Sequence, residues 1–339
     1  MKKFFAVAAS LILSAAMLTA CGSSAAPAAT TGAPETTAAA VTQAPETTEE
    51  TKSFHIAIVQ QLDHASLDEI RLAVEDELTK AAADKGFQVS YKEFNGQNDN
   101  TVLNQIGAQV VSDKYDAIIP IASLAAQCMV TAADGTISDP EAAGLTGLSN
   151  VTGTSDALNT AFILDMMLAA QPDVKTVGLL YSNSEANSQT PIAQAKEYLE
   201  QKGIAYIEKT GNSTDEILTA ASSLVGRVEA VFTPTDNVVM ACEGAVAEIL
   251  NQAGIAHYTG ADSFVAAGAF TTSGVNYTEL GTYTADMAVD ILLGGAVPEY
   301  HVMDGGIITV NTDTAEALGI DYSVFKTMAN TVIEVTTVE

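Results

Sequence analysis

The folded part of this chain contains the same run of alternating strands and helices twice. The predicted strands span 54–60, 87–94 and 115–121 in the first run, and 176–181, 204–209 and 229–233 in the second. The segments between them have the periodicity of amphipathic helices. Such alternation predicts parallel, doubly wound sheets, and its repetition predicts an α/β fold with two similar lobes. A single larger α/β domain is the alternative.

Local signals mark the ends of the predicted helices. Ser66 and Glu69 have the spacing of a capping box at the start of the first helix. Lys85-Gly86 and Lys202-Gly203 end corresponding helices of the two runs, because glycine accepts the left-handed conformation of a helix C-cap. A last strand of the second run, 257–261, leads to Asp262 and Ser263.

Two crossover segments, 150–156 and 274–281, are predicted to join the lobes and to act as a hinge. The polypeptide is therefore predicted to pass between the lobes more than once. The expected limits are 53–152 plus about 279–300 for the first lobe, and 153–278 plus about 301–335 for the second.

The N-terminus has the features of a bacterial lipoprotein signal. Lys2 and Lys3 precede an apolar run that is shorter than a transmembrane helix usually requires, and Leu18-Thr19-Ala20-Cys21 has the pattern of a lipobox. We predict a signal peptide at 1–20 and lipidation of Cys21. An ordinary secretory signal with a chance cysteine is the alternative.

Residues 21–52 are predicted to form a tether between that lipid and the folded part. Beyond Cys21 the segment consists almost entirely of Ala, Thr, Pro, Gly, Ser and Glu, and it cannot bury enough apolar surface to fold. The protein is therefore expected at the cell membrane, lipid-anchored on the extracytoplasmic face.

Composition restricts the possible partners and cofactors. The formal net charge of −28 disfavours nucleic acid and electrostatic adhesion to anionic lipid. Cys128 and Cys242 lie in apolar helical segments and are expected to be buried free thiols. The four histidines have no metal-binding spacing, so neither a metal nor another cofactor is expected.

Polar loops that follow the predicted strands form the candidate ligand site, because ligands of open parallel sheets bind at the carboxyl ends of the strands. Helix N-termini and hydroxyl groups in these loops suit a carboxylate, whereas Asp236, Asp262 and Glu185 suit an ammonium group. The loops therefore predict a site for a small zwitterion, although the same residue types also cap helices. The candidates are Gln60, His64, Ser123, Leu124, Ala125, Glu185, Asn187, Ser188, Asp236, Asn237 and Asp262.

Catalysis has little support in the sequence. The chain has no G-x-S-x-G elbow, no P-loop and no cluster of metal ligands. His64 is one histidine in a predicted loop, where a polar contact or a cap is the commoner role. We therefore expect a binding protein and not an enzyme.

Short motifs follow one another in a fixed order along the folded part: Ile56–Gln60, His64–Asp68, Ile121–Gln127, Ser138–Pro140, Asn150–Asp156, Asn183–Ser188, Pro234–Asn237 and Leu318–Ile320. This series resembles the ABC transporter substrate-binding lipoprotein family that includes tryptophan- and tyrosine-type receptors. The resemblance covers residues 54–335 and implies a type I periplasmic-binding-protein fold, a ligand that is an aromatic or similar amino acid, and delivery to an ABC permease and its ATPase. We expect a monomer.

One departure from the family pattern affects the first lobe. The family has an apolar strand before its Asp-Pro motif, whereas only Gly135-Thr136-Ile137 precedes Ser138-Asp139-Pro140 here. A truncated strand there questions Asp139 as a ligand contact. Two alternatives to an importer subunit stay open: a tethered extracellular sensor and an extracellular enzyme.

Overall fold

The computed structural model describes residues 51–132 and 150–338. The predicted signal peptide, Cys21, most of the tether and Asp139 lie outside these residues. Within the described ranges, no helix combines the length and the apolar character that crossing a membrane requires.

The first lobe is built on a three-stranded parallel sheet with the order β2-β1-β3. Its strands are β1 (Ser53–Gln60), β2 (Gln88–Asn95) and β3 (Ala117–Ile121). Successive side chains of the central strand point to opposite faces, so Ile56 and Ile58 join one apolar core and Ala57 and Val59 another. Both faces of this sheet are therefore covered.

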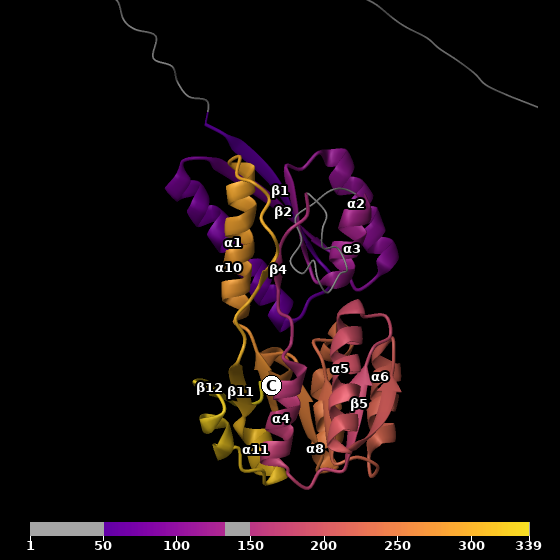
Figure 1. Ribbon diagram of the computed structural model, residues 1–339. Coiled ribbons are helices and arrows are strands. Elements are labelled where there is room, and N and C mark those ends of the chain that lie inside the picture. Colours follow the sequence, from indigo (N-terminus) through magenta and orange to yellow (C-terminus); the bar gives the residue numbers. More distant parts are fainter. Residues whose placement is uncertain (1–50, 133–149, 339) are drawn as a thin grey trace, which may run out of the picture. The chain divides into compact units, whose positions relative to one another are not determined.

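Helices from distant parts of the chain cover this sheet. On one face, α1 (Ala65–Lys85) lies beside α10 (Tyr277–Leu292), which enters from the C-terminal part of the chain (Figure 1). The other face packs against α2 (Asn100–Asp113) and α3 (Ser123–Ala132). The loops that follow β1 and β3 both lie at the carboxyl end of the sheet.

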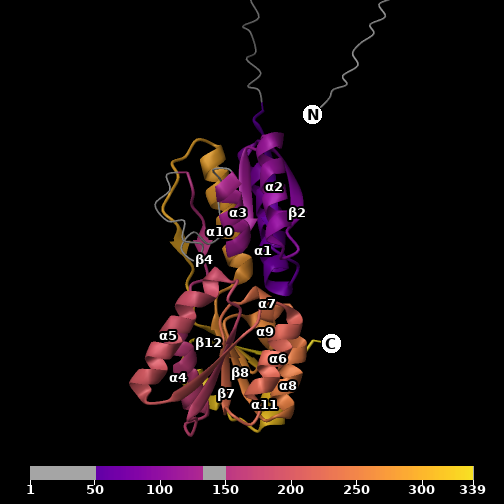
Figure 2. The same cartoon turned by 90° about the vertical axis from the view of Figure 1, so that its right-hand side faces the viewer.

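The second lobe is built on a seven-stranded sheet with the order β12-β11-β9-β8-β7-β5-β6. Figure 2 shows helices on both sides of it, with α4 and α5 opposite α6 and α8. The strands are β5 (Thr176–Tyr181), β6 (Ala205–Thr210), β7 (Ala230–Thr233), β8 (Ala256–Thr259), β9 (Thr271–Gly274), β11 (Ile307–Asn311) and β12 (Thr331–Val335). The helices are α4 (Thr160–Ala170), α5 (Ala186–Lys202), α6 (Thr214–Leu224), α7 (Asn237–Met240), α8 (Glu243–Gln252), α9 (Asp262–Ala266), α11 (Thr312–Leu318) and the 3₁₀ helix η1 (Ser323–Thr327).

The connections between the lobes are more numerous than the two predicted crossovers. The short strands β4 (Thr154–Ser155) and β10 (His301–Val302) pair in parallel, and α10 packs against β4. Chain therefore passes between the lobes after β4, after β9 and after β10. The predicted lobe limits, 279–300 in the first lobe and 301–335 in the second, already imply such a third passage near residue 300. The lobe limits given above stay predictions.

The predicted fold class is confirmed, with two differences in detail. β11 pairs with β9 in the antiparallel direction, whereas the alternation predicted parallel strands throughout. The predicted capping box is wrong: His64 precedes α1 as its N-cap residue, and Ser66 lies inside the helix with its hydroxyl bonded to Ser263. The Ser66 hydroxyl, which the spacing predicted as a helix cap, therefore forms its hydrogen bond with a side chain of another element.

Other local predictions are confirmed. Gly86 and Gly203 both adopt the left-handed conformation directly after α1 and α5, with φ of 73° and 70°. Cys128 and Cys242 are buried free thiols. Glycine after a helix is thus a dependable local signal, because few other residues accept the left-handed conformation.

Candidate functional site

A cavity with an empty volume of about 580 Å³, part of it open to solvent, lies where the two lobes meet. The loop after β1 and the start of α3 contribute from the first lobe, and α5, α7 and α9 contribute from the second. Asp156, in the passage after β4, and Tyr277, at the start of α10, complete the wall. The carboxyl ends of both sheets therefore meet at one pocket, as the topology predicts.

Much of the pocket surface is apolar. Leu67 and Ile70 of α1 face it from the first lobe, Met240 and Phe264 from the second, and Leu280 from α10. Tyr277 adds a second aromatic ring. Apolar walls with a few fixed polar groups are typical of small-molecule sites.

His64 lines the pocket and has one ring nitrogen without a partner among the described residues. Its Nε2 lies 2.9 Å from Asn237 Oδ1, whereas its buried Nδ1 forms no hydrogen bond within the part of the chain that the structure describes. Burial lowers the pKa of His64, against the opposing effects of the Asn237 side chain and the nearby carboxylates. The imidazole is therefore neutral at neutral pH, with one nitrogen as donor and the other as acceptor.

Asn187 and Asp156 place further acceptors on the pocket wall. The Asn187 amide donates to the backbone carbonyl of Thr235, and its buried Oδ1 has no partner among residues 51–132 and 150–338. Asp156 Oδ2 accepts from the Tyr277 hydroxyl at 3.0 Å. Both residues and Thr235 also border an adjoining cavity, so they mark one side of the pocket.

Asp236 is fully buried, and its carboxylate is surrounded by donors of its own lobe. Oδ1 accepts from the N–H groups of Val238 and Val239, which caps α7, while Oδ2 accepts from Ser182 N–H at 2.7 Å and Ser188 Oγ at 2.6 Å. Burial raises the pKa of Asp236 although these bonds favour the charged form. All four acceptor positions of the carboxylate are occupied.

A buried relay of side chains connects the lobes next to the pocket. Gln61 Nε2 donates to Glu185 Oε1 at 2.9 Å, and Asn237 Nδ2 donates to Glu185 Oε2 at 2.6 Å. Burial, together with the negative charge of Asp236, raises the pKa of Glu185 to about 7. A separate bond between Ser66 Oγ and Ser263 Oγ also joins the lobes.

The start of α3 enters the pocket through a turn of one residue. Ala122 has φ of 78°, in the left-handed region that costs an L-residue about 1–2 kcal/mol. Ser123 follows directly as the first residue of α3 and lines the cavity. Leu124 N–H donates to Gln61 Oε1 at 3.1 Å.

The predicted site residues divide into two groups. Five line the pocket: His64, Ser123, Asn187, Asp236 and Asn237. The cavity lining does not include Gln60, Leu124, Ala125, Glu185, Ser188 and Asp262. Glu185, Ser188 and Leu124 contact pocket residues or the relay, while Ala125 is buried in the core of the first lobe. Asp262 borders a different cavity, with Glu69.

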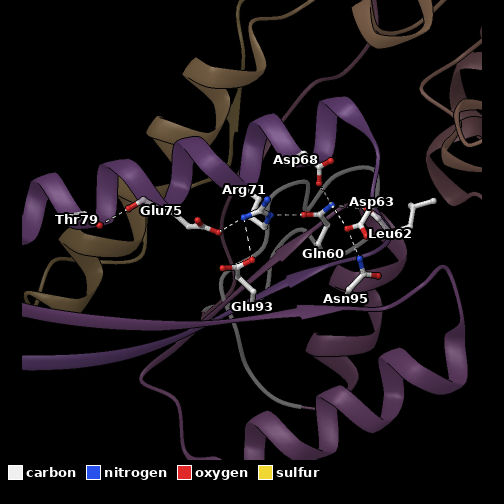
Figure 3. Close-up of polar contacts among 9 residues, drawn as sticks. All are labelled: Gln60, Leu62, Asp63, Asp68, Arg71, Glu75, Thr79, Glu93 and Asn95. Carbon is white, nitrogen blue, oxygen red and sulfur yellow. Dashed lines mark hydrogen bonds and ion pairs between the residues drawn. The ribbon is translucent and has the colours of Figure 1, made fainter. Parts of the chain in front are cut away.

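Gln60 has a role within the first lobe. Its Nε2 donates to the Leu62 carbonyl and to Asp68 Oδ1, and its Oε1 accepts from Arg71 Nε, so it joins the end of β1 to α1 (Figure 3). These bonds link it to α1, and Gln60 is not among the residues that line the pocket.

The sequence analysis missed Asp156, Tyr277 and most of the apolar wall as site residues. Asp156 ends the predicted crossover 150–156, a position that marked it as linker, and its partner Tyr277 lies 121 residues away. The helical periodicity of Leu67 and Ile70 was visible, but it indicated only a buried face.

Comparisons with known proteins agree with this architecture. A family model described as ABC transporter substrate binding protein matches residues 55–331. A Clostridioides difficile (strain R20291) protein named tyrosine-binding protein is 30% identical over 288 residues, which is 80% of this chain and 82% of that protein.

Solved structures cover the folded part as well. The ABC domain in complex with L-Trp from Streptococcus pneumoniae is 28% identical and gives a TM-score of 0.77. The match covers 83% of this chain and 100% of that domain. The ligand-free, open structure of CD0873, a substrate binding protein with adhesive properties from Clostridium difficile, is 32% identical, covers 84% and gives 0.63. The present structure is thus more similar to the ligand-bound neighbour, although its sequence is closer to the open one.

Proposed function

The chain belongs to the ABC transporter substrate-binding protein family, and on that premise we propose that it binds a free amino acid, aromatic ones included, in the pocket between its lobes. The observation that carries this proposal is one cavity with apolar walls, unpaired acceptors and a helix start. Tyrosine and L-Trp, which are named for two relatives, carry the complementary groups: an aromatic side chain, an ammonium group and a carboxylate.

Asp156 and Asn187 are proposed to bind the ammonium group. Asn187 Oδ1 is a buried acceptor with no partner in the described part of the chain, and Asp156 supplies a negative charge on the same side of the pocket. Asp236 is the less suitable partner, because its four acceptor positions are already used. A charged hydrogen bond of this kind is among the stronger polar contacts in proteins.

The carboxylate is proposed to bind at the start of α3. Backbone N–H groups and the positive end of a helix dipole favour an anion there, and Ser123 adds a hydroxyl. The side chain of the ligand would then lie against Leu67, Ile70, Met240 and Phe264. This orientation leaves the two charges of the amino acid at separate polar positions.

The N-terminal predictions belong to the same proposal. We propose that residues 1–20 are a signal peptide, that Cys21 carries a lipid, and that the segment to residue 52 holds the lobes at the extracytoplasmic face of the membrane. The monomer would deliver its ligand to an ABC permease and its ATPase. Mass spectrometry of the native N-terminus should show a lipidated Cys21, and an unmodified Cys21 would contradict the anchor.

A thermal-shift panel tests the ligand class. A ligand that binds only the native state adds about 2.7 kcal/mol at a hundred times its dissociation constant, which raises the melting temperature by several degrees. We expect at least one free amino acid to do so among the twenty, tested beside sugars and nucleosides. Stabilisation by a sugar or nucleoside, and by no amino acid, would overturn the proposal.

A further inference from the structure

His64 lines the pocket, and a chain of hydrogen bonds fixes which of its ring nitrogens carries the proton. The chain begins at Leu124 N–H, a backbone group that can only donate. It donates to Gln61 Oε1, which leaves Gln61 Nε2 as the donor to Glu185 Oε1. The first link therefore fixes the orientation of the Gln61 amide.

The second half of the chain sets the tautomer of the histidine. The Glu185 carboxylate accepts from Asn237 Nδ2, so Asn237 presents Oδ1 to His64. Since Asn237 Oδ1 can only accept, His64 Nε2 carries the proton, and Nδ1 keeps its lone pair. Nδ1 is buried and has no partner within the described residues, so the acceptor is left for a ligand.

The position of His64 separates it from the proposed ammonium site. Asp156 and Asn187 share their side of the pocket with the adjoining cavity, and His64 does not border that cavity. His64 instead lies with Leu67 and Met240, directly before α1 and bonded to the start of α7. It therefore belongs to the wall against which the ligand side chain is proposed to pack.

We infer that His64 is a specificity-determining residue whose Nδ1 accepts a hydrogen bond from an N–H or O–H group of the ligand side chain. The pocket thereby selects amino acids whose aromatic side chain carries a donor, a phenol or an indole, over phenylalanine. The inference rests on the proposed function, because it assumes that an amino acid occupies the pocket. Asn237, Glu185 and Gln61 act as positioning residues for the imidazole.

Calorimetric titrations of the purified protein with L-tyrosine, L-phenylalanine, L-tryptophan and 1-methyl-L-tryptophan test this inference. L-Tyrosine has a side-chain donor that L-phenylalanine lacks, and L-tryptophan has one that 1-methyl-L-tryptophan lacks, so the four ligands form two pairs. We expect the donor-bearing ligand of at least one pair to bind about tenfold more tightly, the value of one satisfied hydrogen bond. His64→Leu should remove that preference by weakening the donor-bearing ligand alone. His64→Asn, which keeps an acceptor near the Nδ1 position, should retain part of it.

The possible results separate this inference from the proposed function. If no amino acid binds, the proposed function fails. If both members of each pair bind equally to the unsubstituted protein, or if His64→Leu weakens both members equally, the inference is overturned while amino-acid binding stands. Equal weakening would mean that Nδ1 contacts the part common to all amino acids.

A spectroscopic measurement tests the relay independently of affinity. The ¹⁵N shifts of the imidazole at about pH 8, above the pKa of Glu185, should show His64 as a single tautomer with the proton on Nε2. The four histidines make the spectrum assignable through His64→Asn. Glu185→Gln should move the proton to Nδ1, because the new amide must turn its oxygen toward Gln61 Nε2 and its NH₂ group toward Asn237 Oδ1, which leaves Asn237 Nδ2 to donate to His64 Nε2. A proton on Nδ1 in the unsubstituted protein would overturn the inference.

Discussion

The turns that follow β3 and β7 occupy matching places in the two lobes, but their helices begin in different ways. After β7, Pro234 and Thr235 lead to Asp236, which accepts from the N–H groups of Val238 and Val239. After β3, α3 begins directly behind Ala122, whose methyl group offers no acceptor. The Asp236 carboxylate caps the start of α7, whereas the residue before α3 supplies no cap.

This difference assigns unlike roles to two loops that the sequence presented as equivalents. A buried carboxylate at the start of α7 repels an anionic ligand and already satisfies two of the N–H groups there. The start of α3 combines a positive dipole end with Ser123 in the pocket. A capped helix start is thus a structural element, and of these two starts that of α3 is the one that suits the carboxylate of a ligand.

The largest expected effect is the loss of fold stability on removing the Asp236 carboxylate. Asp236→Ala should lower the free energy of unfolding by about 4 kcal/mol, because it removes a cap and leaves buried donors such as Ser182 N–H unpaired. Asp236→Asn keeps one amide oxygen for the cap and should cost less. Urea unfolding measures both variants. A large loss of amino-acid affinity with unchanged stability would instead place Asp236 against the ligand.

The next effect concerns Asp156, which we propose as the charged partner of the ligand. Asp156→Asn should weaken amino-acid binding by about 3 kcal/mol, roughly a hundredfold, because a charged partner is removed while the size of the side chain is kept. Asp262→Asn is the matched control, since Asp262 lies outside the pocket. Titration calorimetry compares the two variants. A larger loss from Asp262→Asn would move the ammonium site to that cavity.

Much of this comparison could be predicted from the sequence, and the rest depends on distant contacts. The repeat identified both turns, since strand and helix periodicity are local properties of the chain. The separate roles of Asp236 and Asp156 were not visible, because Ser182, Ser188 and Tyr277 come from other elements. The antiparallel pairing of β11 with β9 was missed for the same reason, because pairing direction depends on where a returning strand lies in space.

Stability should depend on pH through Glu185, the carboxyl group next to Asp236. Its folded-state pKa of about 7 lies above its ordinary value of 4.5, so the folded state binds more protons than the unfolded state between these values. Its contribution is therefore most favourable below about pH 4.5 and is lost as pH rises through about 7, a change on the order of 3 kcal/mol.

Glu185→Gln isolates this contribution. The unsubstituted protein should lose free energy of unfolding between pH 5 and 8, whereas the variant should not lose this contribution, because its amide does not titrate. The difference in stability between the two should therefore shift in favour of the variant as pH rises. Glu316→Gln, on an exposed side chain, controls for the loss of one negative charge. Chemical unfolding at both pH values gives the difference. Equal shifts for the two variants would show that net charge, and not burial of Glu185, sets the dependence.

The smallest effect tests the turn before α3 itself. Among the described residues other than glycine, those with positive φ are Gln97, Asn98, Lys114 and Ala122, all in the first lobe, and Ala122 lies at the pocket. Ala122→Gly relieves about 1–2 kcal/mol of backbone strain but makes the unfolded chain more flexible and removes a half-buried methyl group.

The net result of Ala122→Gly should be a gain of about 0.5 kcal/mol, or 1–2 °C in melting temperature. Ala126→Gly, inside α3 and fully buried, is the matched control and should lose at least about 1 kcal/mol. Differential scanning calorimetry resolves the opposite signs. If both variants lose stability, the strain at Ala122 is too small to set the direction of α3. The turn after β3 would then differ from the turn after β7 only in that the residue before its helix supplies no acceptor.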